Sequence, residues 1–460
     1  MNRQDLYRSV PTPVQNLMAT AYGVRELPRR HGGNYRQYRT DLAVRQLWSE
    51  EQLLDDQLER VRSMLVWCAA RIPHYRELFA DLGFEASDVT SLDALAQLPI
   101  LGKEQVRADP QRFRPEPPSG RVVAQTTGGT TGTPLAYWAT LDAVRFNYAT
   151  YEARTRAWAG VRFGDRMASF HGQPIVPAAE QTPPYWRRNP AFNQLYCSVY
   201  HLNDLTLPAY VDELERFRPD VVVGYTSAVH RVASHLLAVG DVGRVRPRAV
   251  LVSSETLFPS VRTELEQAFG CKVFNSYSLG ELVAYVSQCP EGHLHISTEY
   301  GVIELVDVAG RGQKEIVATG LINRGMPLVR YRTGDVAVAA TEQPSCGRGL
   351  PVLAELVGRS DDVVRTPEGS VVGPAPMSLA FQRVPNLRRA QVLQSDVDSL
   401  QVMLETTEQW GPEDESFLIA ELRRRLGTGI AIDVTQVDVI PRTSGGKERL
   451  IVSDLGGGAR

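Results

Sequence analysis

The stretch RPDVVVGYTSAVHRVASHLLAV, residues 218–239, joins a short apolar run to a segment with helical spacing. The same order recurs downstream, where RAVLVSSE (248–255) precedes the helical segment VRTELEQAF (261–269) and KVFNSYS (272–278) follows it. Continuous apolar runs between helices are typical of strands that are buried on both faces of a sheet. The pattern therefore predicts the α/β class, with a mixed sheet covered by helices on both sides.

Other patterns surround this α/β unit. Residues 40–85 carry apolar positions such as Leu47 at helical spacing and predict helices. The run RVVAQ (121–125) predicts a strand, and a helical pattern extends from Leu141 to Trp158. Beyond the α/β unit, β-rich runs separated by turns predict a β-rich subdomain.

A different unit begins at Gly358. Residues 392–407 predict two strands around the turn SDVDS, residues 413–427 predict a capped helix that ends at Gly427, and AIDVTQVDVIP (431–441) predicts a strand. This order is typical of a small α+β domain. A short final strand is expected after Lys447, which the surrounding glycines place on an exposed loop.

The composition of the chain limits the classes of function that are possible. The chain has 460 residues, 43% of them hydrophobic and 22% charged, with a net charge of -3, so a nucleic-acid partner is not expected. No apolar run approaches the ~20 residues of a membrane span, and the amino terminus lacks the apolar region of a secretory signal. The five cysteines are widely spaced, which favours a reducing, cytoplasmic location over a disulfide scaffold.

Five short motifs carry the chemistry. Taken alone, each could be a turn, a strand end or a solvated hairpin tip. The first is rich in Gly and Thr, which lets several backbone N–H groups and hydroxyls approach phosphate oxygens. The motifs are QTTGGTTGTPL (125–135), YSLGE (277–281), YRTGD (331–335), GRSDD (358–362) and PRTSGGKERL (441–450).

In this order and approximate spacing, the motifs resemble the adenylate-forming, acyl-activating superfamily, specifically its phenylacetate-CoA ligase-like branch. The stretches FRPDVVVGYTSA (217–228) and MPLVRYRTGDVA (326–337) extend the resemblance, which covers about residues 95 to 452. It implies a large amino-terminal region that binds ATP and the acid, residues 1–357, joined by a hinge to a mobile carboxy-terminal domain, residues 358–460.

The resemblance implies a role for each matching residue. Tyr277 is similar to the aromatic residue that packs on adenine, and Glu281 to the carboxylate that binds Mg²⁺. Asp335 is similar to the residue that accepts hydrogen bonds from the ribose. The remaining nucleotide contacts implied in this way are Thr127, Gly128, Gly129, Thr130, Thr131, Gly132, Ser254, Glu255, Ser278 and Arg359.

Lys447 resembles the catalytic lysine of the family. Its ammonium would neutralise charge while a carboxylate oxygen attacks the α-phosphorus of ATP, since such chemistry depends on positioning and electrostatic stabilisation. One departure bears on this role: Thr133 stands where the family often has Lys, so neutralisation falls more heavily on Mg²⁺ and Lys447.

The substrates follow from the same resemblance. The branch implies a small carboxylic acid, with an aromatic one expected, and coenzyme A as the acyl acceptor. The candidates for the acid pocket are Tyr225, Ser227, Ser254, Tyr277 and Gly280, with Trp186 and His171 as weaker ones. The segment VVRTPEGSVVGPAP (363–376) departs from the branch where it shapes the thioester-forming conformation, which leaves other acceptors open: a carrier-protein thiol, an amine or a hydroxyl. A nucleotide-binding protein without catalysis is the alternative from another class, and a homodimer remains open.

A second metal site is suggested by CPEGHLH (289–295). Cys289, His293 and His295, together with Cys346, offer the thiolates and imidazoles that suit a closed tetrahedral Zn²⁺ site. Some relatives carry Cys-x5-His followed by Cys-x-Cys, whereas Pro344 replaces the first Cys of that final pair here. The alternative is a buried free thiol with surface histidines.

Overall fold

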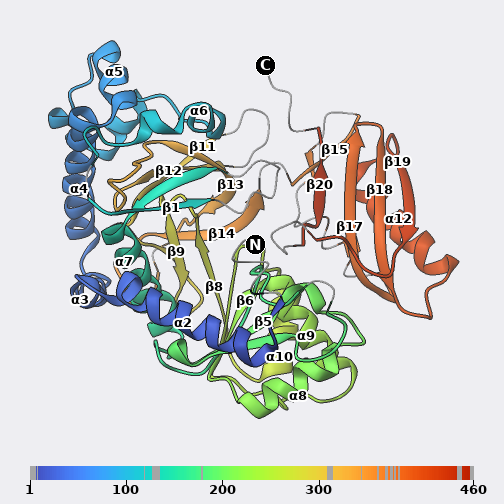
Figure 1. Cartoon of the computed structure of the whole chain (residues 1–460). Helices are drawn as coiled ribbons and strands as arrows, with labels where there is room; N and C mark the ends of the chain where they lie inside the picture. The colour runs from blue at the N-terminus through green and yellow to red at the C-terminus, as the bar shows by residue number, and fades with distance from the viewer. Residues whose placement is uncertain are drawn as a thin grey trace.

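The amino-terminal region contains one large sheet (Figure 1). The computed structural model describes residues 7, 9–118, 120–126, 135–177, 180–307, 314–342, 344–359, 362–367, 371–372, 377, 380–381, 384–442 and 448–455. Within these residues the sheet has twelve strands, in the order β11-β12-β13-β14-β10-β9-β8-β7-β6-β3-β5-β4. Its parallel part consists of β3 (Met167–His171), β5 (Gln194–Ser198), β6 (Val221–Tyr225), β7 (Ala249–Ser253) and β8 (Val273–Ser278).

The α/β prediction is confirmed in this parallel part. The three runs predicted as strands are β6, β7 and β8, and helices lie between them in the chain. One face of the sheet packs against α8 (Leu207–Phe217), α9 (Thr226–Ala238) and α10 (Pro259–Phe269) in a continuous buried core. At Gly224 a Cβ would collide with the carbonyl oxygen of Phe170 on β3, so glycine allows these neighbouring strands to approach closely.

The β-rich subdomain predicted after residue 300 forms the other half of the same sheet. Its strands are β9 (Tyr285–Gln288), β10 (Leu294–Ile296), β11 (Gly301–Asp307), β12 (Lys314–Gly320), β13 (Tyr331–Ala339) and β14 (Val352–Arg359). All of them pair in antiparallel fashion. Helices α4 (Glu50–Arg71) and α5 (Pro73–Leu82) pack against this half through Leu65, Tyr75 and their neighbours. These helices confirm the prediction for residues 40–85.

One detail of the amino-terminal prediction was wrong, and another was confirmed with a local irregularity. Leu47 does not pack but lies 69% exposed just after α3 (Tyr35–Arg45), because the helix ends before it. The helix expected over 141–158 is present, but its hydrogen-bond pattern changes after α7 (Leu141–Thr150) to a π-helical turn (Tyr151–Arg156) before the helix ends at Trp158. Such turns interrupt α-helices frequently at functional sites.

An additional helix, α2 (Thr12–His31), was not predicted at all. It contacts β4 (Trp186–Asn189) and α7, and Figure 1 shows it crossing in front of the lower part of the sheet. The internal Pro28 weakens the helical pattern, whereas Arg29 and Arg30 in the last turn suit the negative end of a helix dipole.

The carboxy-terminal unit confirms the expected ββαβ order. Strands β17 (Leu387–Asp396) and β18 (Ser399–Thr406) form a hairpin, and α12 (Pro412–Leu426) precedes β19 (Ala431–Gln436). The final strand β20 (Ile451–Ser453) pairs in parallel with β17. Figure 1 shows this unit beside the large region rather than within it.

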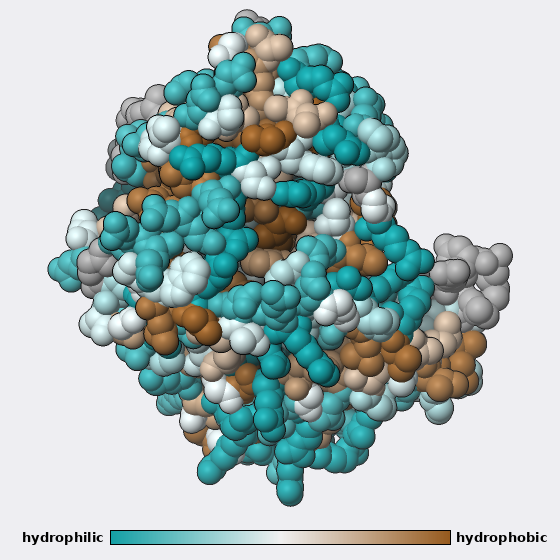
Figure 2. Space-filling view, turned by 90° about the vertical axis from the view of Figure 1, so that its left-hand side faces the viewer, coloured by the Kyte–Doolittle hydropathy of each residue, from teal (hydrophilic) through white to brown (hydrophobic). Residues whose placement is uncertain are grey.

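The molecular surface is mostly polar on the side that carries α3 to α5. Figure 2 shows hydrophilic side chains over most of this face, with apolar ones in small separate patches. Among the described residues, no helix combines the length and the apolar character needed to cross a membrane.

Candidate active site

A cavity of about 1660 Å³ opens at the carboxyl ends of β6, β7 and β8. Ligands of open α/β sheets bind at this edge, because strand ends and the loops after them converge there. Residues of the carboxy-terminal unit, including Arg389 and Glu448, line the cavity together with residues of the sheet. The cavity therefore lies between the two parts of the chain.

Two predicted motifs meet in this cavity. The Tyr277 hydroxyl, at the end of β8, donates a hydrogen bond of 2.8 Å to Asp335 Oδ2 on β13. Burial and the Asp335 carboxylate raise the pKa of Tyr277 well above its usual value, so the phenol remains a donor. YSLGE and YRTGD, which are far apart in the sequence, are thus joined by direct contact.

Glu281 joins the same two motifs a second time. Its side chain lines the cavity although the residue is only 6% exposed, and Oε1 accepts a hydrogen bond of 3.2 Å from the Tyr331 hydroxyl. A buried carboxylate with a neutral donor keeps oxygen lone pairs for a hard cation. The arrangement fits the Mg²⁺ role implied for Glu281.

The loop after β7 is held by Glu255. Its carboxylate accepts hydrogen bonds from Ser227 N at 2.7 Å and Ser227 Oγ at 3.1 Å, and from Glu448 N at 3.0 Å. Ser254 has φ 71°, in the left-handed region that favours glycine. Glu255 therefore connects the loop to α9 and to the carboxy-terminal unit.

We expect Glu255 to make stability pH-dependent. Burial, with a contribution from the Glu448 carboxylate, raises its pKa from 4.5 to about 7. Between these values the folded protein binds more protons than the unfolded chain, so stability falls as pH rises through this window. The contribution is present below the lower value and is lost above the upper one, by at most ~3 kcal/mol. Thermal unfolding from pH 5 to 8 should show a steeper fall for the wild type than for Glu255→Gln, and equal slopes would contradict the assignment.

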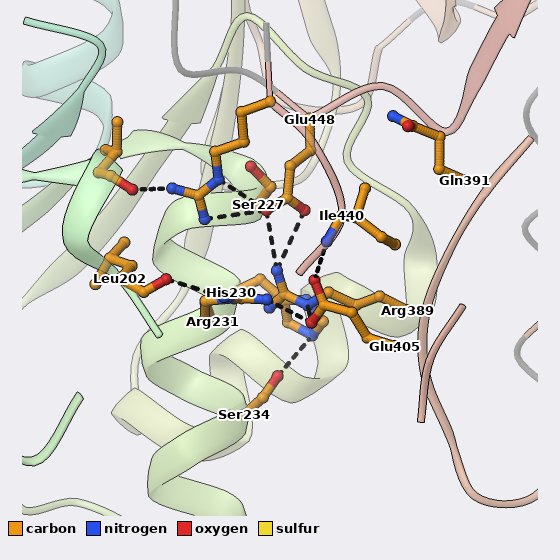
Figure 3. A network of polar contacts seen from close by, with 12 residues as sticks. Leu202, Ser227, His230, Arg231, Ser234, Arg389, Gln391, Glu405, Ile440 and Glu448 are labelled. Carbon is orange, nitrogen blue, oxygen red and sulfur yellow. Dashed lines mark hydrogen bonds and ion pairs between the residues drawn. The ribbon is translucent and has the colours of Figure 1, made fainter. Parts of the chain in front are cut away.

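Beyond Glu448, an ion-pair network connects the two parts (Figure 3). Arg231 on α9 pairs with Glu405 on β18 at 2.5 Å, with side chains 6% and 10% exposed. Arg231 also donates to the Leu202 carbonyl at 2.9 Å, and Ile440 N donates to Glu405 Oε1 at 2.8 Å. Glu448 lies 3.1 Å from Arg389 in the same network.

Replacing Arg231 with Gln is expected to destabilise the contact between the two parts by ~3 kcal/mol, because a buried carboxylate loses its closest cation. Chemical unfolding and limited proteolysis between the two parts would measure this loss. Arg388→Gln is the matched control, since Arg388 and Asp204 also bridge the parts but are 51% and 66% exposed. Equal effects of both substitutions would contradict the role of burial, and the double variant with Glu405→Gln should recover part of the loss.

Several predicted residues lie outside the described part of the chain. These include Lys447 and the loop residues from Thr127 to Gly132. The nearest described neighbours, Thr126 and Glu448, both line the cavity. Arg359 is described by its backbone, which pairs with Asp335 at the end of β14.

The acid-pocket candidates divide into two groups. Tyr225, Ser227, Ser254, Tyr277 and Gly280 line the cavity, as does Ser278, and the weaker candidate His171 does so too. Trp186 was wrongly predicted: it is 8% exposed and packs edge-on against Tyr210 in the core, because β4 turns it toward the helices instead.

Sequence reasoning missed a whole wall of the cavity. The residues concerned come from α2, α7, the π-helical turn and β5, and no motif marks them: Tyr22, Arg30, His31, Tyr148, Arg156 and Tyr196.

Three of the four expected zinc ligands come together. The ligand atoms of Cys289, His295 and Cys346 lie within 4.8 Å of one another, and Cys346 Sγ is 3.2 Å from His295 Nε2. His295 Nδ1 lies 3.0 Å from the Leu350 carbonyl, a contact that orients Nε2 toward the thiols. His293 was expected to join them but lies outside the cluster, with Nε2 3.4 Å from Ser345 Oγ. His293 precedes β10, which carries His295, and the two imidazole ring centroids lie 6.2 Å apart.

Known proteins resemble the chain along its length. Residues 364–454 match the CapK C-terminal domain family. Protein CapK of Staphylococcus aureus is 26% identical over 456 residues, covering 98% of this chain and 99% of the relative. A phenylacetate-coenzyme A ligase of Pseudomonas putida is 26% identical over 408 residues, covering 85% and 90%.

Solved structures share the fold. The 2-hydroxyisobutyryl-CoA ligase, in the postadenylation state in complex with R3-HIB-AMP, has a TM-score of 0.69 at 18% identity, covering 89% of this chain and 91% of that one. The same ligase with 2-HIB-AMP and CoA, in the thioesterification state, has a TM-score of 0.53 at 19% identity, with coverage of 89% and 91%. The chain is thus similar over most of its length to Protein CapK and to phenylacetate-coenzyme A ligases, shares the fold of an acyl-CoA ligase, and matches the CapK C-terminal domain family over residues 364–454.

Proposed function

We propose that the protein activates a carboxylic acid as acyl-AMP and passes the acyl group to coenzyme A. The observation that carries this proposal is the convergence of YSLGE and YRTGD in one cavity, through the Tyr277–Asp335 and Tyr331–Glu281 contacts. A free carboxylate is a poor acyl donor, and AMP supplies a stabilised leaving group. The acid oxygen attacks the α-phosphorus, pyrophosphate leaves, and the thiol then displaces AMP.

The described residues divide the work between binding and orientation. Tyr277 offers a ring for adenine, and Asp335 offers carboxylate oxygens for the ribose hydroxyls. Glu281 would hold Mg²⁺, which when bound neutralises phosphate charge. Lys447 and the loop from Thr127 to Gly132 are proposed to contact the phosphates, on the strength of the motifs that contain them.

The second half-reaction is proposed to use a rotation of the carboxy-terminal unit. Here that unit contacts the sheet through Glu448 and Glu255. The TM-score is higher with a postadenylation structure than with a thioesterification structure of the same ligase. This difference supports a postadenylation arrangement of the carboxy-terminal unit relative to the sheet. Rotation about a hinge would replace one set of contacts by another.

Coenzyme A is the proposed acceptor because the relatives that span most of the chain include CoA ligases. A carrier-protein thiol or an amine is the second candidate, since residues 363–376 depart from the branch pattern. The proposed acid is aromatic, which the phenol rings of Tyr148, Tyr196 and Tyr225 along the cavity support.

Acid-dependent exchange of pyrophosphate into ATP tests the first half-reaction. A panel of aryl and alkyl acids is expected to give exchange that requires both Mg²⁺ and an acid. Parallel reactions with coenzyme A, with cysteamine and with buffer alone then show which compound accepts the acyl group. A thioester is expected to form only with coenzyme A. No exchange with any acid would refute the proposed activity.

A structural Zn²⁺ is proposed for Cys289, His295 and Cys346. Elemental analysis of protein purified without added metal is expected to give one zinc per chain, and Cys346→Ser should lower this content and the thermal midpoint. Cys271→Ser is the matched control, because Cys271 is a free cysteine outside the cluster. Zinc-free protein of unchanged stability would dismiss the site.

A further inference from the structure

The cavity does not end at the nucleotide side but continues beneath α2. Its floor in this direction is apolar and consists of Val223 on β6, Leu251 on β7 and Met167 on β3. Tyr148 and Tyr196 line it further on, and Arg30 of α2 lies at this end. The extension thus has an apolar floor and a polar end.

The extension is long. Tyr277 lies on β8 and Tyr196 on β5, and the sheet order places β7, β6 and β3 between these strands. Four steps of about 4.8 Å between neighbouring strands span roughly 19 Å. An acid that fills this space would have its far end well away from the carboxylate that reacts.

The far end carries an excess of positive charge. Glu26 is shared by Arg25 at 3.4 Å, Arg29 at 2.8 Å and Arg30 at 3.7 Å. Arg156 pairs with Glu152 at 3.1 Å, so the three guanidinium groups that line this end, those of Arg25, Arg30 and Arg156, face two carboxylates. By contrast, the carboxylates that line the cavity among the described residues belong to its nucleotide and carboxy-terminal side: Glu255, Glu281, Asp335, Asp362 and Glu448.

Two buried nitrogen atoms at this end have no hydrogen-bond partner within the described part of the chain. They are Nε of Arg156, a residue that is 9% exposed, and Nδ1 of His31. Leaving such a group unsatisfied costs ~1–3 kcal/mol, which a ligand oxygen could offset. Burial and the cations Arg156 and Arg30 lower the pKa of His31 to about 4, so its neutral ring can donate from one nitrogen.

We propose that the acid substrate carries a second, anionic group at the end remote from the carboxylate that is activated, and that the Arg30 and Arg156 end of the cavity binds it. This inference rests on the proposed function. Guanidinium groups bind carboxylates through charge-assisted, often bidentate hydrogen bonds. An acid without the second group would leave the excess positive charge unmatched in a partly buried site.

The experiment compares three acids of each length: a dicarboxylic acid, the monocarboxylic acid and the ω-amino acid. In pyrophosphate exchange, the best dicarboxylic acid is expected to exceed its monocarboxylic partner by at least ~10-fold in kcat/KM, a difference of about 1.4 kcal/mol. Arg30→Gln should remove most of this preference, while Arg30→Lys should retain part of it.

Arg29→Gln is the matched control. Arg29 pairs with the same Glu26 and lies on the same helix, but it does not line the cavity. The preference for dicarboxylic acids should survive this change. Equal losses in both variants, or equal rates with monocarboxylic and dicarboxylic acids, would overturn the inference and leave the proposed function standing.

Calorimetry without ATP gives an independent readout. The dicarboxylic acid of the panel that binds the wild-type protein most tightly is expected to bind Arg29→Gln equally well and Arg30→Gln about tenfold more weakly. If no acid supports exchange, the proposed function fails. The calorimetric difference between the two variants still tests whether the Arg30 end of the cavity binds an anionic group. Binding that is unaffected by Arg30→Gln would overturn it.

Discussion

Replacing Lys447 with Ala is expected to slow acyl-AMP formation roughly 10²-fold or more, while the attack of a thiol on preformed acyl-AMP stays largely intact. The negative charge on the α-phosphate oxygens must be stabilised while the acid oxygen approaches, and a positioned ammonium supplies that stabilisation. The neighbouring Glu448 contacts Glu255 through its backbone, which supports a contact of this segment with the cavity in the first half-reaction. After rotation of the carboxy-terminal unit, the lysine would no longer be needed.

Separate assays of the two half-reactions measure this difference. Pyrophosphate exchange reports the first, and release of AMP from synthetic acyl-AMP in the presence of coenzyme A reports the second. Lys272→Ala is the control, because the ammonium of Lys272 donates to the Pro290 carbonyl and the residue does not line the cavity. Equal losses in the two half-reactions would refute the assigned role of Lys447.

Replacing Glu281 with Gln is expected to raise the Mg²⁺ concentration needed for half-maximal exchange roughly tenfold or more, a loss of at least about 1.4 kcal/mol of binding free energy. The neutral amide retains the size of the side chain but removes the negative charge that a hard dication prefers. Because Glu281 is only 6% exposed, solvent screens this charge less than it would at the surface.

Titration of Mg²⁺ at saturating ATP and acid measures the effect. Tyr331→Phe is the matched comparison, since it removes the donor to Glu281 Oε1 but keeps the carboxylate. A smaller rise is expected for this variant, because the metal would lose only an orienting partner. An unchanged Mg²⁺ requirement in Glu281→Gln would exclude this residue from the metal shell.

The sequence was sufficient for much of the fold. The apolar runs that became β6 and β7 are buried on both faces, so their composition alone marks them as strands between helices. The turn and the helix of the carboxy-terminal unit also carry local signals, such as Gly427 after α12. Tyr277, Glu281 and Asp335 were found because short motifs contain them.

The tertiary structure alone determined the contacts between residues that are distant in the chain. Trp186 belongs to the core and not to the acid pocket because of the direction in which β4 faces. The pairing of Arg231 with Glu405 depends on how two separate units meet. No local pattern encodes either contact, since each depends on how separate elements are placed in space.

The far wall of the cavity is the clearest case. Arg30 and Arg156 belong to segments more than a hundred residues apart, and in the sequence they look like ordinary surface arginines. Only the packing of α2 against α7 and β4 brings them to the cavity that Val223 and Leu251 line. The local chemistry of the chain determined its fold class and the motifs from which nucleotide binding is proposed, whereas the charge and length of the proposed acid site arose from long-range packing.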